Sequence, residues 1–264
     1  MSLNINAPQP YGSTAPTYSP APLPRYVPTS SRANIVTILL IIGAVLSVVS
    51  SIISLSELIF PGALFGDEES TDPLTLALAL LALGIGLLTA IVYIATVVFF
   101  LMWLYRAHEN LHAFGVKRNQ LEYSSGWAVG SFFVPFVSLV VPYRAIRELW
   151  RKSIPESSNM FGSISPPGFF SAWWGFWIVS NIADQMYMRM TWTEKVSTDV
   201  SATVGVISGI LGTIAAFFAI KVVREIERQQ TESSRLLSVQ SAFPNPPLPP
   251  EFAQDPGSTY PVSG

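Results

Sequence analysis

Five long apolar stretches alternate with polar segments along this chain. They cover residues 34–60, 74–104, 126–141, 169–188 and 202–223. About 20 consecutive apolar residues are needed for a helix to cross the hydrocarbon core of a bilayer. Four of the five stretches reach that length, so the pattern predicts an all-α integral membrane protein.

The second stretch has recognisable helix ends. Asp72 can cap its first turn, and Pro73 suits the first helical position. At about 1.5 Å per residue, this stretch is longer than the bilayer core is thick. We therefore expect the helix to project into the interface as far as Ala113, with Gly115 as its C-terminal stop.

The distribution of lysine and arginine favours four spans over five. With five spans, the fifteen basic residues divide seven to eight between the two sides. If residues 126–141 instead enter and leave on one side, thirteen lie on that side, which is the excess expected of cytoplasmic loops. Pro135 and Pro142 favour such a break, because proline removes a backbone donor and kinks a helix. We predict about four spanning helices, a proline-broken re-entrant or interfacial segment, and both termini in the cytoplasm; five spans is the alternative.

The segment after Pro142 is amphipathic. Its apolar face carries Tyr143, Ile146, Leu149 and Trp150, and four basic residues on the other side are candidates for contact with lipid headgroups: Arg144, Arg147, Arg151 and Lys152. We expect this helix to lie in the interface, with a belt of tryptophans at the same level: Trp103, Trp127, Trp150, Trp173 and Trp174. An ordinary surface helix would show the same amphipathic pattern.

Composition sets the domain limits and excludes some classes of function. Residues 1–32 and 230–264 are proline-rich and polar, so we expect disordered tails around a membrane domain at 33–229. Charged residues make up 12% of the chain, against about 25% in a typical soluble domain. A net charge of −2 gives no reason to expect nucleic acid, and the absence of cysteine excludes disulfides and thiolate metal sites.

One motif suggests chemistry. His108-Glu109-Asn110-Leu111-His112 has the H-E-x-x-H spacing, in which His108 and His112 could bind zinc while Glu109 activates a water molecule. A catalytic zinc needs a third protein ligand. The predicted topology places Asp184 toward the outer face, far from the histidines, and neither Glu148 nor Glu122 stands in a recognisable third-ligand motif. The alternative is that both histidines decorate a solvated helix end, so we expect no cofactor.

Polar and small residues inside the apolar stretches have two interpretations each. Asn181, Asp184 and Glu57 could serve a proton or cation path, or could hydrogen-bond between helices near the outer ends of the spans. The spacing of Gly205, Gly209 and Gly212 permits close helix approach. That approach could occur within the bundle or in a homodimer.

Three segments resemble a bacterial membrane protein family catalogued as domain of unknown function 4328. They are WLYRAHENL at 103–111, GWAVGSFFVPFVSLVVPYRAIRELWRK at 126–152 and WWGFWIVSNI at 173–182. The resemblance covers roughly residues 75–230 and implies a multi-span bacterial membrane protein with no assigned activity. It matches Trp103, Arg106, Asn110, Trp127, Pro135, Pro142, Glu148, Trp150, Trp173 and Trp174. Ser138 stands near the place where the family pattern often has an asparagine.

These observations favour a non-enzymatic scaffold or sensor of the bacterial inner membrane, with a basic surface on its cytoplasmic face. Anionic lipid is the expected partner of that surface. The alternatives are a membrane zinc peptidase using the HENLH motif and a small transporter or channel using Glu57 and Asp184.

Overall fold

The computed structural model describes residues 24–60, 73–154, 165–192 and 197–242, and this part of the chain is helical with no strand. Four long helices form the bundle: α1 (Ser30–Ile59), α2 (Pro73–Ala113), α5 (Phe169–Trp192) and α6 (Thr198–Ala242). Five short elements lie between α2 and α5: η1 (Arg118–Gln120), α3 (Ser125–Gly130), η2 (Ser131–Phe133), η3 (Val137–Leu139) and α4 (Val141–Lys152).

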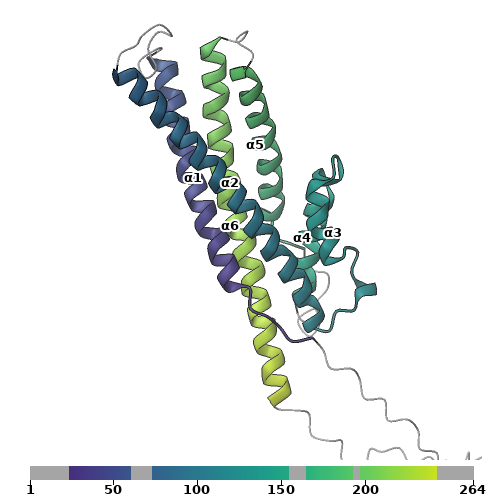
Figure 1. The fold of residues 1–264 in the computed structure, drawn as a ribbon. Helices are drawn as coiled ribbons and strands as arrows, with labels where there is room; N and C mark the ends of the chain where they lie inside the picture. Colours follow the sequence, from purple (N-terminus) through teal and green to yellow (C-terminus); the bar gives the residue numbers. More distant parts are fainter. Residues whose placement is uncertain (1–23, 61–72, 155–164, 193–196, 243–264) are drawn as a thin grey trace, which may run out of the picture.

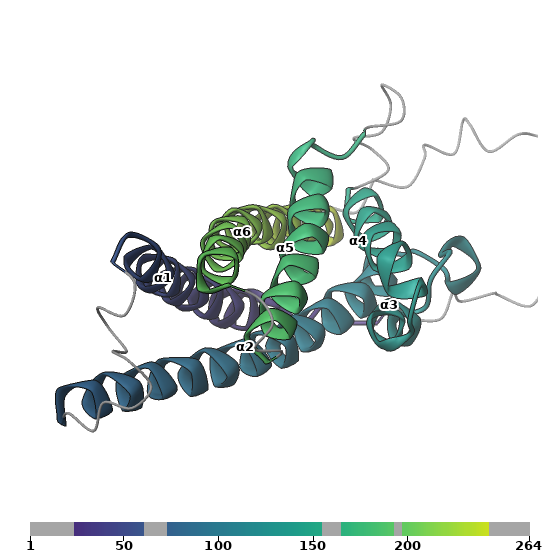
Figure 2. The same ribbon diagram turned by 90° about the horizontal axis from the view of Figure 1, so that it is seen from above.

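The long helices alternate in direction. α1 and α5 run one way and α2 and α6 the other, so α1 begins and α6 ends towards the same end of the bundle (Figure 1). We call this end, where the residues preceding α1, the end of α2 and the end of α4 meet α6, the base. α6 packs between α1 and α5, whereas α2 crosses α1 and its first half diverges from the other helices (Figure 2).

The ends of α2 agree with the sequence. The helix begins at Pro73 and ends at Ala113, and Asp72 lies outside the described residues. Gly115 has a φ of 87°, which favours glycine. The N–H groups of Gly115 and Val116 donate to the carbonyls of His112 and Leu111, the bond pattern of a Schellman motif. The predicted extension to Ala113 and the stop at Gly115 are confirmed.

The outer surface of the bundle is apolar. Leu80, Leu83, Leu87 and Ile91 on α2 are each more than half exposed, and α1 shows a similar row of isoleucines and valines. Water-soluble monomers rarely expose continuous apolar surface on this scale. Among the described residues, three helices are long and apolar enough to cross a membrane: Ser30–Ile59, Pro73–Ala113 and Asp199–Val239. This agrees with the prediction of a helical membrane protein.

α5 is not one of those three helices, although the sequence suggested a span at 169–188. The helix has 24 residues, which is enough length, but its second half carries Asn181, Asp184 and Arg189. Its first half is rich in tryptophan, which is amphipathic rather than strongly apolar.

Residues 126–141 do not form one helix. They are divided among α3, two 3₁₀ turns and an irregular stretch at Pro135–Phe136, where Phe136 has a φ of 62°. The indole of Trp174 on α5 donates to the carbonyl of Leu139 at 2.9 Å, which holds the irregular backbone against the bundle. Two side chains at the break face outward, because Phe133 is 70% and Phe136 85% exposed.

Both boundaries of the membrane domain differ from those expected. Helix α6 continues to Ala242, and Gln230 and Ser233 are buried, so the limit expected at 230 falls inside a packed helix. At the other end, α1 begins at Ser30 and the preceding Thr29 is buried. The described helices therefore extend past both expected boundaries, from Ser30 at one end and to Ala242 at the other. The remainder of both tails lies outside the described residues.

The tryptophans pack in the core instead of forming a lipid-facing belt. Trp103, Trp150, Trp173 and Trp174 are at least 94% buried, together with Phe170, Leu104 and Ile226. Trp127 alone of the five is well exposed. Four of the five rings fill the space between helices, because the broken segment and α4 cover α2 and α5 on this side.

The glycines of α6 face α1 of the same chain. A Cβ atom placed on Gly209 would lie 2.0 Å from Ser51 Oγ and 2.8 Å from the carbonyl of Ser47. One on Gly205 would lie 2.8 Å from Ser54 Oγ. The face that includes Gly205, Gly209 and Gly212, which the sequence offered as a homodimer surface, is thus covered by α1.

We predict that Gly209→Ala lowers the thermal unfolding temperature of the detergent-purified protein by several degrees, since overpacking a helix contact costs about 1–3 kcal/mol. Gly86→Ala is the matched control. Its new methyl group meets nothing within 4 Å, and alanine is the better helix former. Equal unfolding temperatures for the two variants would contradict the α1–α6 contact.

Candidate functional site

The three side chains of the H-E-x-x-H motif contact three different parts of the protein. His108 is fully buried, and its Nε2 lies 3.4 Å from the carbonyl of Ala145 on α4. His112 Nδ1 lies 2.8 Å from the carbonyl of Val116, beyond the helix end. Glu109 accepts a hydrogen bond from the Ser125 hydroxyl at the start of α3.

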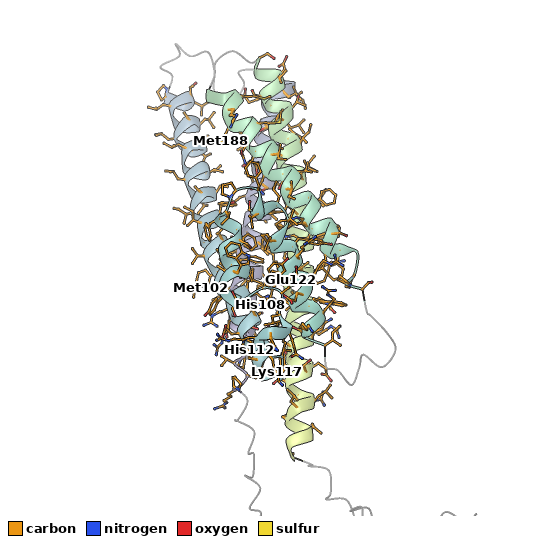
Figure 3. All side chains as sticks on the ribbon, turned by 90° about the vertical axis from the view of Figure 1, so that its right-hand side faces the viewer. Met102, His108, His112, Lys117, Glu122 and Met188 are labelled. Carbon is orange, nitrogen blue, oxygen red and sulfur yellow. The ribbon has the colours of Figure 1, made fainter. Side chains whose placement is uncertain are left out.

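The geometry does not favour a zinc centre. Across the described ranges, no three His, Cys, Asp or Glu side chains are close enough to hold a metal ion. Figure 3 shows His108, His112, Lys117 and Glu122 in the base half of the molecule. Within this half, the candidate ligand Glu148 already accepts hydrogen bonds from two backbone N–H groups.

Glu148 fastens the connection between α2 and α3. This buried carboxylate on α4 accepts from the backbone N–H of Glu122 at 2.6 Å and of Tyr123 at 3.2 Å. A buried carboxylate is costly unless it is hydrogen-bonded, and two backbone donors satisfy it. The Tyr123 hydroxyl in turn donates to Glu122. Glu148 therefore holds the connection between α2 and α3 against α4.

Asn110 joins α2 to the residues that precede α1. Its Oδ1 accepts from the N–H of Val27 at 3.2 Å, and its Nδ2 donates to the carbonyl of Val27 at 2.9 Å. The same Nδ2 lies 3.3 Å from Oε1 of Gln230 on α6. The buried amide of Asn110 thus both accepts from and donates to the backbone of Val27, and it also contacts α6.

Gln230 continues the connection to α4. Its Nε2 donates to the carbonyl of Ala107 at 2.8 Å and lies 3.2 Å from the hydroxyl of Ser153, just after α4. The Ser233 hydroxyl donates to the carbonyl of Ser153 at 2.6 Å. We call Val27, Asn110, Gln230, Ser153 and Ser233 the base network.

A second contact fixes the start of α1 to α6. The Thr29 hydroxyl donates to the carboxylate of Glu227, and both side chains are buried. Tyr26 stacks on Phe114 with ring centroids 5.6 Å apart. Partial burial, and secondarily the nearby Glu227 carboxylate, raise the pKa of the Tyr26 phenol. The short segment before α1 is thus held at Tyr26, Val27 and Thr29.

The sequence analysis missed Gln230, Glu227, Ser153 and Thr29. One signal could have revealed the first two. On α6, the buried positions Val223, Ile226, Glu227, Gln230 and Ser233 continue a single helical stripe beyond the end of the apolar run. Hydropathy ends that run at Val223, whereas helical periodicity continues it through polar residues.

The apolar face of α4 packs on the protein. Its residues Ala145, Ile146, Leu149 and Trp150 are buried against other described residues, so protein covers this face. A place for α4 in the membrane interface stays an expectation. On its outer side, Arg144, Arg151 and Lys152 are exposed. Arg147 is half-buried and lies 5.4 Å over the ring of Tyr143. Headgroup contact by these four residues remains an expectation.

The resemblance also singled out Pro142, Pro135, Arg106 and Trp127. Pro142 is buried in the first turn of α4, and Pro135 marks the break in the 126–141 segment. Arg106 is half-buried and lines an open groove at the base, and Trp127 is 46% exposed.

Two of the polar residues that the sequence placed inside the spans form hydrogen bonds with helix residues. Asp184 accepts from the Ser208 hydroxyl on α6, and Asn181 Nδ2 donates to the carbonyl of Trp177 at 2.7 Å within α5. Glu57 is partly exposed near the end of α1. The Asp184 contact joins two helices, and the Asn181 contact lies within one helix. Hydrogen bonding of this kind was the alternative to a transport path.

Comparison with known proteins agrees with the resemblance noted from the sequence. The family described as "Domain of unknown function (DUF4328)" matches residues 69–228, more than half of the chain. No curated protein and no solved structure matches the chain.

We predict that Asn110→Ala and Gln230→Ala each reduce the free energy of unfolding by about 1–3 kcal/mol, because each leaves buried polar groups without partners. The double variant should lose less than the sum of the two, with a coupling of about 0.5–3 kcal/mol. Thermal unfolding in detergent measures these losses. Glu232→Gln, an exposed change on the same helix, is the control. Strict additivity would contradict the direct contact.

Proposed function

Because the chain belongs to the family described as Domain of unknown function (DUF4328), whose description names no activity, we propose a function from the geometry of the base. The protein is a non-enzymatic scaffold or sensor of the bacterial inner membrane. In this proposal α1, α2, α5 and α6 cross the bilayer, the 126–141 segment enters and leaves on one side, and the base faces the cytoplasm.

The observation that carries this proposal is the base network. It connects the segment before α1 with α2, α4 and α6 through buried side chains that bond one another and the backbone. An active site needs polar groups that converge on a space where substrate can bind. Polar groups satisfied within the fold instead stiffen a surface, which suits a protein that presents fixed attachment points.

The arrangement of the chain ends supports the same conclusion. The residues that precede α1 and the end of α6 both lie at the base (Figure 1), so the two proline-rich ends of the sequence are attached to the same side of the fold. The exposed basic residues of α4 belong to this end as well. Such an arrangement favours the presentation of tails and a charged surface together.

The alternating helix directions and the broken segment support four crossings. The proline-broken stretch is held by Trp174 and exposes Phe133 and Phe136 near its middle. These features suit a segment that enters lipid from the base and returns to the same side. Placing it so leaves thirteen of the fifteen basic residues on the cytoplasmic side.

Single-cysteine labelling tests this topology cleanly, because the chain has no native cysteine. We predict that Asp199→Cys, at the start of α6, reacts with an impermeant maleimide on intact cells. Lys117→Cys, Lys152→Cys and Glu232→Cys should react only after the membrane is permeabilised. All four positions are exposed in the fold. Labelling of either Lys117→Cys or Lys152→Cys from outside, with the other shielded, would establish the five-span alternative.

Metal analysis separates the scaffold from the zinc peptidase. We predict that the full-length protein, purified without chelator and supplied with zinc, retains less than one zinc ion per chain. His112→Ala, which alters the less buried histidine, should not change that amount. One zinc per chain, lost in both His108→Ala and His112→Ala, would overturn the non-enzymatic proposal.

A further inference from the structure

An open groove of about 470 Å³ lies at the base, on the outer side of α2. Val27 and Arg32 come from the beginning of the α1 region, Val129 comes from α3, and the remaining lining residues come from α2: Leu101, Met102, Tyr105 and Arg106. The groove is therefore shaped by three elements that the tertiary fold brings together.

The groove combines two positive charges with an apolar lining. Arg32 and Arg106 are both half-buried, and neither is paired with a carboxylate in the described part of the chain. Three nearby carboxylates bond other groups, since Glu109 accepts from Ser125, Glu148 from two backbone N–H groups and Glu227 from Thr29. The groove therefore has two guanidinium groups without an ion-pair partner among the described residues.

The apolar lining continues into the lipid-facing surface of α2. Towards the start of α2 from Tyr105 and Met102, exposed apolar residues recur at spacings of three or four. They are Val98, Ile94 and Ile91. Such spacing places them on one face. An acyl chain lying on this face would meet apolar side chains along its whole length, while its headgroup would reach the two arginines.

We propose that this groove binds the phosphate headgroup of an anionic phospholipid, with Arg32 and Arg106 as the phosphate ligands. Guanidinium groups bind phosphate oxygens through paired, charge-assisted hydrogen bonds. Basic pockets between membrane helices on the cytoplasmic side bind anionic headgroups in this way. Leu101, Met102 and Val129 hold the upper parts of the acyl chains, a lining poorly suited to a free, strongly hydrated anion.

This site is separate from the basic outer side of α4. The groove is on α2, and none of Arg144, Arg147, Arg151 and Lys152 lines it. The membrane placement proposed above decides which leaflet supplies the lipid. Binding in detergent does not depend on that placement, so a failed topology test and a failed lipid test are distinguishable.

Native mass spectrometry of the full-length protein in detergent measures the binding. We expect one phosphatidylglycerol per chain to be retained at least about tenfold more tightly than phosphatidylcholine, and to raise the unfolding temperature. Arg32→Gln and Arg106→Gln should each weaken phosphatidylglycerol binding about tenfold or more, since a hydrogen bond to a charged group is lost. Arg106→Lys should retain part of the affinity, because it keeps the charge without the guanidinium fork.

The controls determine whether the site is the groove and whether the ligand is lipid. Arg235→Gln removes the same single charge from an exposed position of α6 and should leave the bound lipid in place. If Arg106→Gln fails to fold, Arg32→Gln carries the test. Equal retention of the two lipids, or equal loss in Arg235→Gln, would overturn the proposal. Stabilisation by inorganic phosphate or glycerol phosphate equal to that by phosphatidylglycerol would show a free-anion site instead and would also overturn it.

Discussion

The need to satisfy buried polar groups organises the base of this protein. Asn110 is buried in a helix whose other buried residues, apart from His108, are apolar, so its amide must find partners within the fold. It finds them in the backbone of Val27 and the side chain of Gln230. Gln230 then needs partners of its own, which Ala107 and Ser153 provide. One requirement therefore determines where three helices and the entering chain meet.

Much of the membrane architecture was predictable from the sequence, because hydropathy and helix-end chemistry are local. The long helices, the end of α2 at Ala113 and the Gly115 stop all depend on residues within a few positions of one another. The family resemblance was also correct. The cover over the apolar face of α4 was not predictable, because an amphipathic pattern is the same whether lipid or protein packs on it. The structure shows that protein does.

The candidate site was predicted less well, because its parts are far apart in the sequence. Arg106, Asn110 and Glu148 were singled out, but their partners were not. Asn110 pairs with Val27 and Gln230, which lie on opposite sides of it in the chain. No local spacing joins such residues. The H-E-x-x-H spacing, in contrast, is entirely local, and it pointed to a metal site where the fold sends the three side chains to separate partners.

The base network and the groove are physically linked through two residues. Val27 is hydrogen-bonded to Asn110 and also lines the groove, and Arg106 lies one helical turn before Asn110 on α2. The groove therefore has its full lining only when the segment before α1 is docked. A ligand that binds the complete groove must stabilise that docked segment. By the same linkage, loss of docking must weaken ligand binding by an equal free energy. Occupancy of the groove and docking of the segment before α1 are therefore one linked equilibrium.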